Sequence, residues 1–531
     1  MTALRPAPPA GAGRIGVGSE GIPGEVDLVV AGLGITGAGV ALDAATRGLR
    51  VLAVDAHDLA FGTSRWSSKL VHGGLRYLAH GQVGVAHESA VERGILMEVT
   101  APHLVHPMSM LAPLTSSVSS SQAALTRVGF TAGDLLRRSA HTRAETLPRP
   151  RHLSATETLA LAPDLRRAGL RGGLLSWDGQ LEDDARLVVA VARTAAAFGA
   201  EVRARVRVTQ ASGTEVELRD EVTGTTTTVA TRACLNATGV WAGQVDPAVR
   251  LRPSRGTHLV LRGDSLPGLR TAVTAPIPGS TSRYVLVLPQ PDGLMYVGLT
   301  DEPIDGPVPD VPMPTEAEIG FLLDVVAAVF ERPLRRSDVV GAFAGLRPLL
   351  SDGTSGETAD LSRKHAVLIR PDGLVTVVGG KLTTYRRMAQ DAVDAALTTA
   401  GISAGPCVTA TQPLVGAASA IELAALEAPS RLVRRFGAEA PLVLDVARRV
   451  TGLGNTELLA PLSAHVPVTR AELVFAVTHE GARTVADLLE RRTRVALVPA
   501  DLAAVTDAAT EMLMICPDWS IDALAEPRPS T

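Results

Sequence analysis

The chain has 531 residues, which is too long for one ordinary hydrophobic core, so two or three domains are expected. Hydrophobic residues make up 46% and charged residues 20%, which is typical of a globular protein and excludes a disordered one. A net charge of -4 gives none of the basic excess that nucleic-acid binding needs, so no nucleic-acid partner is expected. Three distant cysteines, Cys234, Cys407 and Cys516, favour a reducing cytoplasm over a disulfide framework or a metal site.

The start of the chain is rich in Gly, Pro and Ala and lacks the continuous apolar region of a signal peptide. We therefore expect residues 1–24 to form a disordered tail. No later run stays apolar over the roughly 18 residues that a membrane span requires. Any contact with a membrane is expected at its surface.

A dinucleotide-binding motif follows. The apolar run 26–30 predicts a strand, AGLGITG forms a glycine turn, and residues 38–47 predict a helix before a second strand over 51–54. Glycines in such a turn allow backbone to approach a pyrophosphate, and the helix N-terminus attracts phosphate. An unrelated tight turn is the alternative. The expected cofactor contacts are Gly32, Gly34, Ile35, Thr36 and Gly37, with Asp55 on the adenosine ribose.

The next stretch, TSRWSSKLVHGGLRYL over 63–78, favours FAD over NAD. A plain NAD-binding domain would continue with strands and helices, whereas this stretch supplies hydroxyls suited to a pyrophosphate and ribityl chain. Lys69 and His72 could reach the isoalloxazine ring, although His72 could also be an incidental histidine in a polar loop. The expected contacts are Thr63, Ser64, Ser67, Ser68, Lys69, Leu70, His72, Gly73 and Gly74.

This segment resembles the N-terminal region of FAD-dependent glycerol-3-phosphate dehydrogenases, within the D-amino-acid-oxidase-like flavoprotein family. The family pattern SSKLxHGGLRYL, which lines the flavin and the substrate pocket, is matched from 67 to 78 without a gap. Two departures are local: Asp55 stands where Glu is usual, and Arg65-Trp66 replaces small residues. The resemblance covers nearly the whole chain after the tail.

The resemblance implies an α/β fold with three domains. They are a Rossmann-like FAD-binding domain over 25–110, 165–250 and 335–395, an antiparallel-sheet substrate-binding domain over 111–164 and 251–334, and a C-terminal helical domain over 396–531. Apolar spacing from 420 onward independently predicts helices in the last domain. The acidic cluster 182–184 stands where a helix begins, so capping explains it and no metal site is expected.

Later motifs extend the expected cofactor site. The NATG run over 236–239 resembles the stretch that borders the pyrophosphate in the family, and a second glycine turn over 379–386 opens a helix that favours an anion. The expected contacts here are Val208, Ala237, Gly239, Trp241, Gly345, Gly380, Lys381, Leu382 and Thr383.

The resemblance implies oxidation of sn-glycerol 3-phosphate to dihydroxyacetone phosphate, with hydride passing from C2 to flavin N5 and electrons passing to a membrane quinone. Arginine suits a substrate dianion because its planar fork binds phosphate through two hydrogen bonds. His258 is the candidate base, and Arg347 or Lys381 could lower the pKa of the C2 hydroxyl. A surface salt bridge is the alternative for Arg347. The expected substrate-binding residues are Arg76, Tyr77, His258, Arg347, Arg363 and Lys381.

Other functions stay open. An oxidase that passes electrons to oxygen is not separated by the motifs, and an amine oxidase or a flavin-binding regulator without activity would keep the same fold. The mostly apolar stretch 122–138, with basic residues beyond it, predicts either a packed helix or an interfacial helix held by anionic lipid headgroups. We expect a homodimer in the cytoplasm, in peripheral contact with the inner face of the cell membrane.

Overall fold

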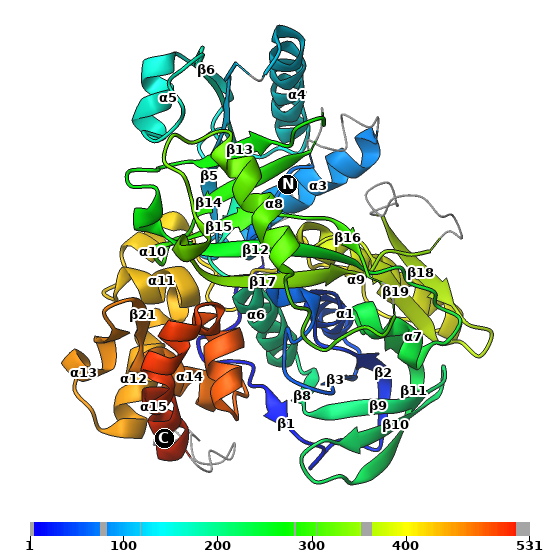
Figure 1. The fold of residues 1–531 in the computed structure, drawn as a ribbon. Helices are drawn as coiled ribbons and strands as arrows, with labels where there is room; N and C mark the ends of the chain where they lie inside the picture. Colours follow the sequence, from blue (N-terminus) through cyan, green and yellow to red (C-terminus); the bar gives the residue numbers. More distant parts are fainter. Residues whose placement is uncertain are drawn as a thin grey trace.

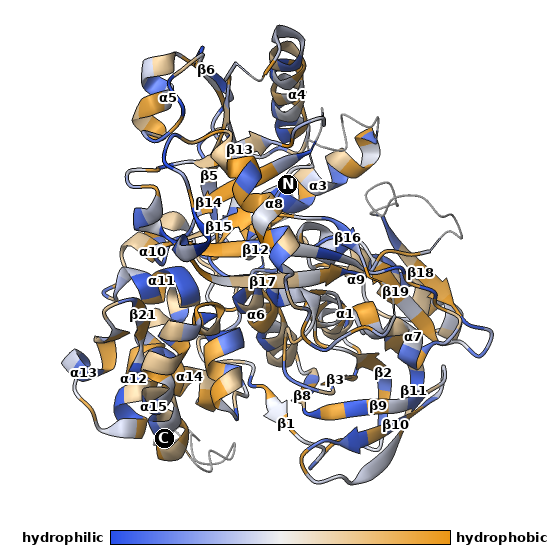
Figure 2. Ribbon diagram, in the orientation of Figure 1, coloured by the Kyte–Doolittle hydropathy of each residue, from blue (hydrophilic) through white to orange (hydrophobic). Residues whose placement is uncertain are grey.

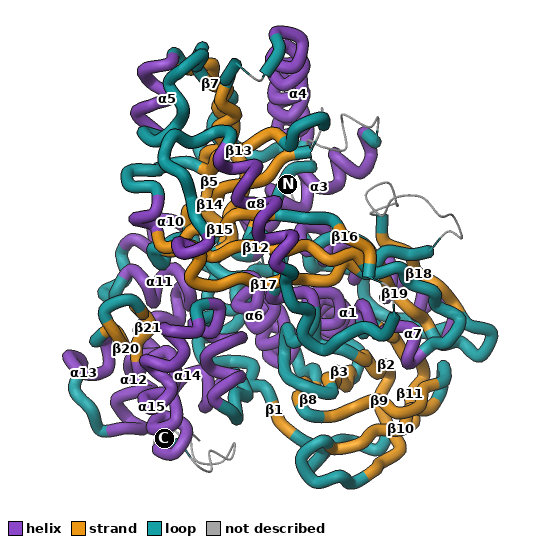
Figure 3. The backbone as a smooth tube through the Cα atoms, viewed as in Figure 1, coloured by secondary structure: helices purple, strands orange, loops and turns teal. Residues whose placement is uncertain are grey.

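The computed structural model describes residues 5–74, 82–116, 118–280, 283–304, 306–351 and 364–516. In this part the chain forms two large sheets and a separate body of helices (Figure 1). Figure 3 shows the helices of the C-terminal region gathered beside the strand-rich remainder of the molecule. None of the helices in the described ranges is long and apolar enough to cross a membrane.

The first sheet contains the predicted glycine motif. Its strands are β1 (Gly16–Val17), β2 (Glu25–Ala31), β3 (Val51–Asp55), β8 (Glu201–Ala204), β9 (Val206–Ala211), β10 (Glu215–Asp220), β11 (Thr226–Asn236), β18 (His365–Ile369) and β19 (Val375–Gly379). The main path runs β1-β8-β3-β2-β11-β10-β9, and β19 pairs with β11 and β18. Strands β1, β8, β3, β2, β11 and β19 pair in parallel, as in a Rossmann-like sheet.

Three helices pack together beside this sheet. They are α1 (Ile35–Thr46), α6 (Asp184–Ala197) and α9 (Tyr385–Ala400). Small residues let α1 lie close to α9, since a Cβ added to Gly39 would stand 2.8 Å from Cδ2 of Tyr385. Asp183 begins α6 by accepting hydrogen bonds from two N–H groups of the first turn, which confirms the capping interpretation of the acidic cluster.

The second sheet is mostly antiparallel. Its strands are β4 (Leu70–Val71), β5 (Val105–Pro113), β6 (Arg151–Leu153), β7 (Gly173–Leu181), β12 (Ser254–Arg262), β13 (Ala272–Pro276), β14 (Tyr284–Pro289), β15 (Leu294–Gly298), β16 (Glu302–Pro303) and β17 (Val339–Arg347). They run in the order β16-β12-β15-β14-β13-β5-β7-β4, with β17 paired to β12 and β6 to β7. Hydrophobic residues follow β12, which lies between β17 on one side and β15 and β16 on the other (Figure 2).

Strand pairing differs from the domain ranges expected from the sequence. Those ranges put β7, β17 and most of β5 in the FAD-binding domain, but all three strands pair within the second sheet. The chain changes sheet as many times as the ranges require, but it does so at other residues. Four further helices accompany the second sheet and its connections: α3 (Val83–Ile95), α4 (Ser120–Ser139), α5 (Ala155–Leu161) and α8 (Glu316–Ala327).

The C-terminal region is helical, as its apolar spacing predicts. Its helices are α10 (Ala420–Ala424), α11 (Ser430–Phe436), α12 (Ala440–Thr451), α13 (Asn455–Leu459), α14 (Arg470–His479) and α15 (Pro499–Ile515). Helix α14 is buried from Ala471 to His479 and forms the centre of a separate hydrophobic core. A short hairpin of β20 (Pro461–Ser463) and β21 (Val466–Thr469) was not predicted.

Residues 5–24 do not form the disordered tail expected from their composition. Strand β1 adds to the edge of the first sheet beside β8. The guanidinium of Arg193 donates to the carbonyl oxygen of Gly13 at 3.0 Å, and the N–H of Gly11 donates to Glu439 Oε1 at 2.8 Å. Because backbone groups make these contacts, an analysis of apolar side chains could not find them.

Candidate active site

A cavity of about 1520 Å³ is lined by residues of both sheets. The first sheet contributes the glycine turn between β2 and α1 and the loop that follows β3. The second sheet contributes residues of β5, β7, β14 and the end of β17. A large concave space with convergent polar groups is the usual form of a cofactor site.

Most residues expected to contact the cofactor line this cavity. They are Gly32, Gly34, Ile35, Thr36, Asp55, Thr63, Ser64, Ser67, Ser68, Leu70, His72, Val208, Ala237, Gly239, Trp241, Gly345, Gly380, Lys381, Leu382 and Thr383. The expected substrate residue Arg347 also lies in the wall. The fold therefore brings motifs that are hundreds of residues apart to one space.

The helix that follows the first glycine turn suits a pyrophosphate. Helix α1 has no acidic residue in its first turn, and Gly34 at its N-cap makes no side-chain cap. The N–H of Ile35 donates to Ser64 Oγ at 2.9 Å, which joins the turn to the hydroxyl-rich stretch. A helix start of this kind keeps a positive dipole end toward the cavity, so the residues present fit FAD.

The carboxylate of Asp55 fixes the loop after β3. Its Oδ2 accepts the N–H of Leu33 at 2.7 Å, and its Oδ1 accepts the N–H of His57 at 2.8 Å. The shorter Asp side chain thus holds the backbone of the glycine turn. The rings of His57 and Phe61 stack with centroids 4.0 Å apart, and both line the cavity, although neither belongs to a motif that could be recognised in the sequence.

Four of the expected cofactor contacts do not reach the cavity wall. Gly37 serves packing instead, since a Cβ there would stand 1.8 Å from the carbonyl oxygen of Gly32. Gly73 donates its N–H to Asp178 Oδ1 at 3.0 Å. The remaining two are Lys69 and Gly74.

The side chain of Lys69 is buried in an ion pair rather than lining the cavity. Its side chain is 1% exposed, and its ammonium group donates to Asp184 Oδ2 at 2.8 Å and to the carbonyl oxygen of Arg65 at 2.7 Å. Burial lowers the pKa of Lys69, and the charge of Asp184 opposes that shift. Lys69 is therefore the cation of a buried ion pair that fixes the stretch to the start of α6.

His258 lies on β12 as expected, but it does not line the cavity. Its Nε2 is 2.8 Å from Ser68 Oγ, and Ser68 does line the cavity. One ring face stacks on Phe343 with centroids 4.8 Å apart, and the ring also lies close to Gly298, where an added Cβ would be 2.2 Å from Cδ2. Burial, with the charges of Lys69 and Arg347, lowers the pKa of His258 to about 3, so the imidazole is neutral.

The alternative interpretation of Arg347 was a salt bridge on the protein surface, but its side chain lies in the cavity wall. Its Nη1 donates to Asp301 Oδ1 at 3.0 Å and its Nη2 donates to the carbonyl oxygen of Thr300 at 3.1 Å. Both acceptors belong to residues of the cavity wall. Lys381 donates to Ser89 Oγ at 2.8 Å, so the side chains of both cations are held in defined positions.

The pair Arg65-Trp66, which had no interpretation from the sequence, makes two distinct contacts. Arg65 pairs with Glu490 of the C-terminal region, and its Nε donates to the carbonyl oxygen of Phe61 at 2.9 Å. Trp66 stacks beside Phe343 with centroids 5.9 Å apart. The departure from small residues therefore serves contacts with β17 and with the C-terminal region.

Three expected substrate residues, Arg76, Tyr77 and Arg363, lie outside the described residues. Within the described ranges, no group of three or more His, Cys, Asp or Glu side chains is arranged to hold a metal ion. In the acidic cluster 182–184, the carboxylate of Asp184 accepts hydrogen bonds from Lys69 and, at 2.7 Å, from the hydroxyl of Ser67.

The fold and this cavity define a class: a dinucleotide-binding protein whose second sheet closes over the cofactor site. A family model described as FAD dependent oxidoreductase matches residues 27–386, and one described as C-terminal domain of alpha-glycerophosphate oxidase matches residues 407–521. The class is therefore that of the flavoprotein oxidoreductases.

Relatives of known name narrow this class. Glycerol-3-phosphate dehydrogenase 1 of Mycobacterium tuberculosis is 53% identical over 496 residues, which cover 92% of this chain and 95% of that protein. The mitochondrial glycerol-3-phosphate dehydrogenase of Arabidopsis thaliana is 34% identical over 527 residues, which cover 90% of this chain and 81% of that protein. The solved structure of the glycerol-3-phosphate dehydrogenase from Bacillus halodurans, complexed with FAD, matches with a TM-score of 0.69 and 27% sequence identity. The match covers 94% of this chain and 92% of that chain.

The chain belongs to the family of FAD-dependent glycerol-3-phosphate dehydrogenases. The resemblance inferred from residues 67–78 is thereby confirmed, and so is FAD as the cofactor of the family. The three-part architecture, with Rossmann-like sheet, second sheet and C-terminal helices, is confirmed as well.

Proposed function

We propose that this protein oxidises sn-glycerol 3-phosphate to dihydroxyacetone phosphate and passes the electrons to a membrane quinone. The observation that carries the proposal is the position of two held cations, Arg347 and Lys381, in the wall of the FAD cavity. A phosphate dianion is the kind of ligand that such cations attract. Relatives named glycerol-3-phosphate dehydrogenase support the choice of substrate.

FAD, when bound, supplies the two-electron acceptor that takes a hydride from C2 of the substrate at flavin N5. The protein supplies the remaining groups. In the proposal, Arg347 binds the phosphate with its guanidinium fixed by Asp301, and Lys381 stabilises negative charge near the flavin. The proposal also assigns substrate binding to Arg76, Tyr77 and Arg363.

The proton of the C2 hydroxyl needs a base, and we assign this role to His258 acting through Ser68. The Ser68 hydroxyl stands in the cavity wall and is 2.8 Å from the imidazole, so it can pass the proton on. The charge of Arg347 contributes to the low pKa of His258. A dianion bound to Arg347 opposes that effect and makes the imidazole a better base.

Helix α4 is the part of the cavity wall that we propose for membrane contact. Leu125 and Phe130 line the cavity, while Leu125, Val128 and Leu135 are 59%, 65% and 59% exposed. The exposed guanidinium of Arg138 near the end of the helix suits an anionic headgroup. In this proposal the protein is a homodimer on the inner face of the cell membrane, and quinone meets the cavity beside α4.

An anaerobic visible spectrum of the purified protein tests the proposal. Adding glycerol 3-phosphate should bleach the flavin band at once, whereas glycerol, which lacks the phosphate, should not. A quinone analogue should then restore the band faster than air does; the reverse order would make the protein an oxidase. A flavin band unchanged by glycerol 3-phosphate would overturn the substrate, and an amino acid that bleaches it would point to an amine or amino-acid oxidase.

A further inference from the structure

The C-terminal region holds the loop that forms one end of the FAD cavity. Asp58 lies three residues after Asp55, and its carboxylate accepts three hydrogen bonds. Arg491 Nε donates at 2.7 Å, and both terminal nitrogens of Arg492 donate at 2.8 Å. All three side chains are between 1% and 3% exposed, so this contact is sealed from water.

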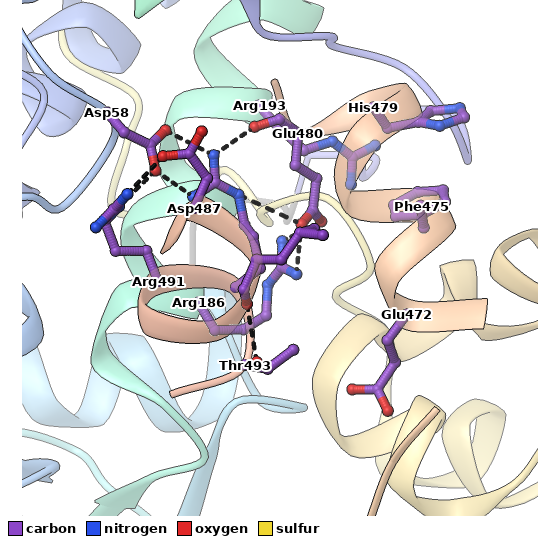
Figure 4. A network of polar contacts seen from close by, with 12 residues as sticks. Asp58, Arg186, Arg193, Glu472, Phe475, His479, Glu480, Asp487, Arg491 and Thr493 are labelled. Carbon is purple, nitrogen blue, oxygen red and sulfur yellow. Dashed lines mark hydrogen bonds and ion pairs between the residues drawn. The ribbon is translucent and has the colours of Figure 1, made fainter. Parts of the chain in front are cut away.

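Two further contacts reach the same loop. The backbone N–H of Arg205 donates to the carbonyl oxygen of His57 at 2.8 Å, while its side chain donates to Asp487 Oδ1 at 2.7 Å. Arg65 ties the carbonyl oxygen of Phe61 to the C-terminal residue Glu490. Figure 4 shows the side chains of Asp58 and Asp487 turned toward the guanidinium of Arg491.

The opposite side of the loop faces the cofactor. Asp55, His57 and Phe61 all line the cavity, and the stacked rings of His57 and Phe61 lie 16° from parallel. Asp58 stands between these residues in the sequence but points toward the C-terminal region. One short loop therefore carries both the cofactor wall and the docking contact.

We propose that the C-terminal domain is a positioning element for the cofactor, with residues 487–492 holding residues 55–61 in the conformation that accepts the adenosine end of FAD. The inference concerns the loop over 55–61 rather than the proposed substrate residues, so it stands apart from the proposed function. Coupling between two sites is reciprocal, so bound FAD and the docked domain stabilise each other.

The variant Asp58→Asn tests this role because it keeps the shape of the side chain and removes its charge. Hydrogen bonds to charged groups contribute about 1.5–3 kcal/mol, so the dissociation constant for FAD should rise about 10- to 100-fold. The measurement is titration of the full-length apoprotein with FAD, followed by quenching of flavin fluorescence. The rise in melting temperature caused by saturating FAD should also be smaller in the variant.

Glu439→Gln is the matched control. Glu439 pairs with Arg193 at 2.6 Å, also between the C-terminal region and the first sheet's helices, and both side chains are at most 3% exposed. Neither residue lines the cavity. The control should lower the melting temperature of the apoprotein about as much as Asp58→Asn does, yet leave the dissociation constant for FAD within about 2-fold.

Two results would overturn the inference. One is an unchanged dissociation constant for FAD in Asp58→Asn; the other is an equal rise in both variants, which would mean that domain docking acts on FAD only through general stability. If Asp58→Asn does not fold, Arg492→Lys carries the same test. Lysine keeps the charge and loses the two-pronged contact, so FAD binding should weaken less, and unchanged binding would again count against the role.

Discussion

His103 gives a prediction of how stability depends on pH. The residue lies just before β5, is 2% exposed, and its Nδ1 has no hydrogen-bond partner among the described residues. Burial, together with the charge of Arg186, lowers the pKa of His103 from 6.5 to about 3. The native protein therefore keeps this imidazole neutral at pH values where the unfolded chain would protonate it.

The sign follows from proton binding. Between pH 3 and pH 6.5 the unfolded state binds more protons at His103 than the native state does, so stability rises with pH and falls on acidification. At pH 7 the effect is small. At pH 5 the unfolded histidine is almost fully protonated and the native one is not, which destabilises the fold by about 2 kcal/mol.

The variant His103→Gln removes the titrating group and keeps a polar side chain. Urea unfolding of wild type and variant at pH 7 and pH 5 measures the loss of unfolding free energy on acidification. That loss should be about 2 kcal/mol smaller in the variant, whatever its stability at pH 7. His152→Gln, at an exposed position on β6, is the control and should behave like wild type. Equal losses in wild type and His103→Gln would refute the reasoning.

Three other variants test the site and the proposed membrane face. His258→Ala should slow flavin reduction by about 10²- to 10⁴-fold at normal FAD content; near-normal rates in stopped-flow experiments would reject the base. Lys69→Met leaves Asp184 buried without its cation and should lower the unfolding free energy by about 3–5 kcal/mol. Urea titration measures this loss, and an unchanged unfolding free energy would contradict the prediction. Val128→Asp with Leu135→Asp should stop cosedimentation with vesicles of anionic lipid; undiminished binding, with substrate bleaching intact, would place the contact elsewhere.

The cofactor site could be predicted from the sequence because much of its chemistry is contiguous. The glycine turn over 32–37 and the carboxylate of Asp55 meet requirements of the nearby backbone. A short stretch of sequence is therefore enough to recognise each of them. Lys69 shows the limit. Its partner Asp184 lies 115 residues away, so composition alone could not separate a buried ion pair from a cofactor contact.

Strand membership and the N-terminal segment could not be predicted for a related reason. Strands β7 and β17 lack a regular alternation of buried and exposed residues, so their pattern alone does not say which sheet each strand joins. Residues 5–24 are held by backbone hydrogen bonds and by the guanidinium of Arg193, interactions that have no signature in hydropathy. The sequence predicts that His258 lies on a strand, but not that Ser68 separates it from the cavity. That position depends on packing of the imidazole against Phe343.

The pair Arg65-Trp66 departs from the family pattern at the point where the cofactor stretch meets the C-terminal domain. A small residue at position 65 could not span from the carbonyl oxygen of Phe61 to Glu490, so this link depends on the guanidinium of Arg65. Glu490 also accepts Arg491 Nη1 at 2.8 Å, which joins Arg65 to the same network that grips the loop after β3. Arg65 therefore reinforces a connection from the C-terminal domain to the part of the cavity lined by His57 and Phe61.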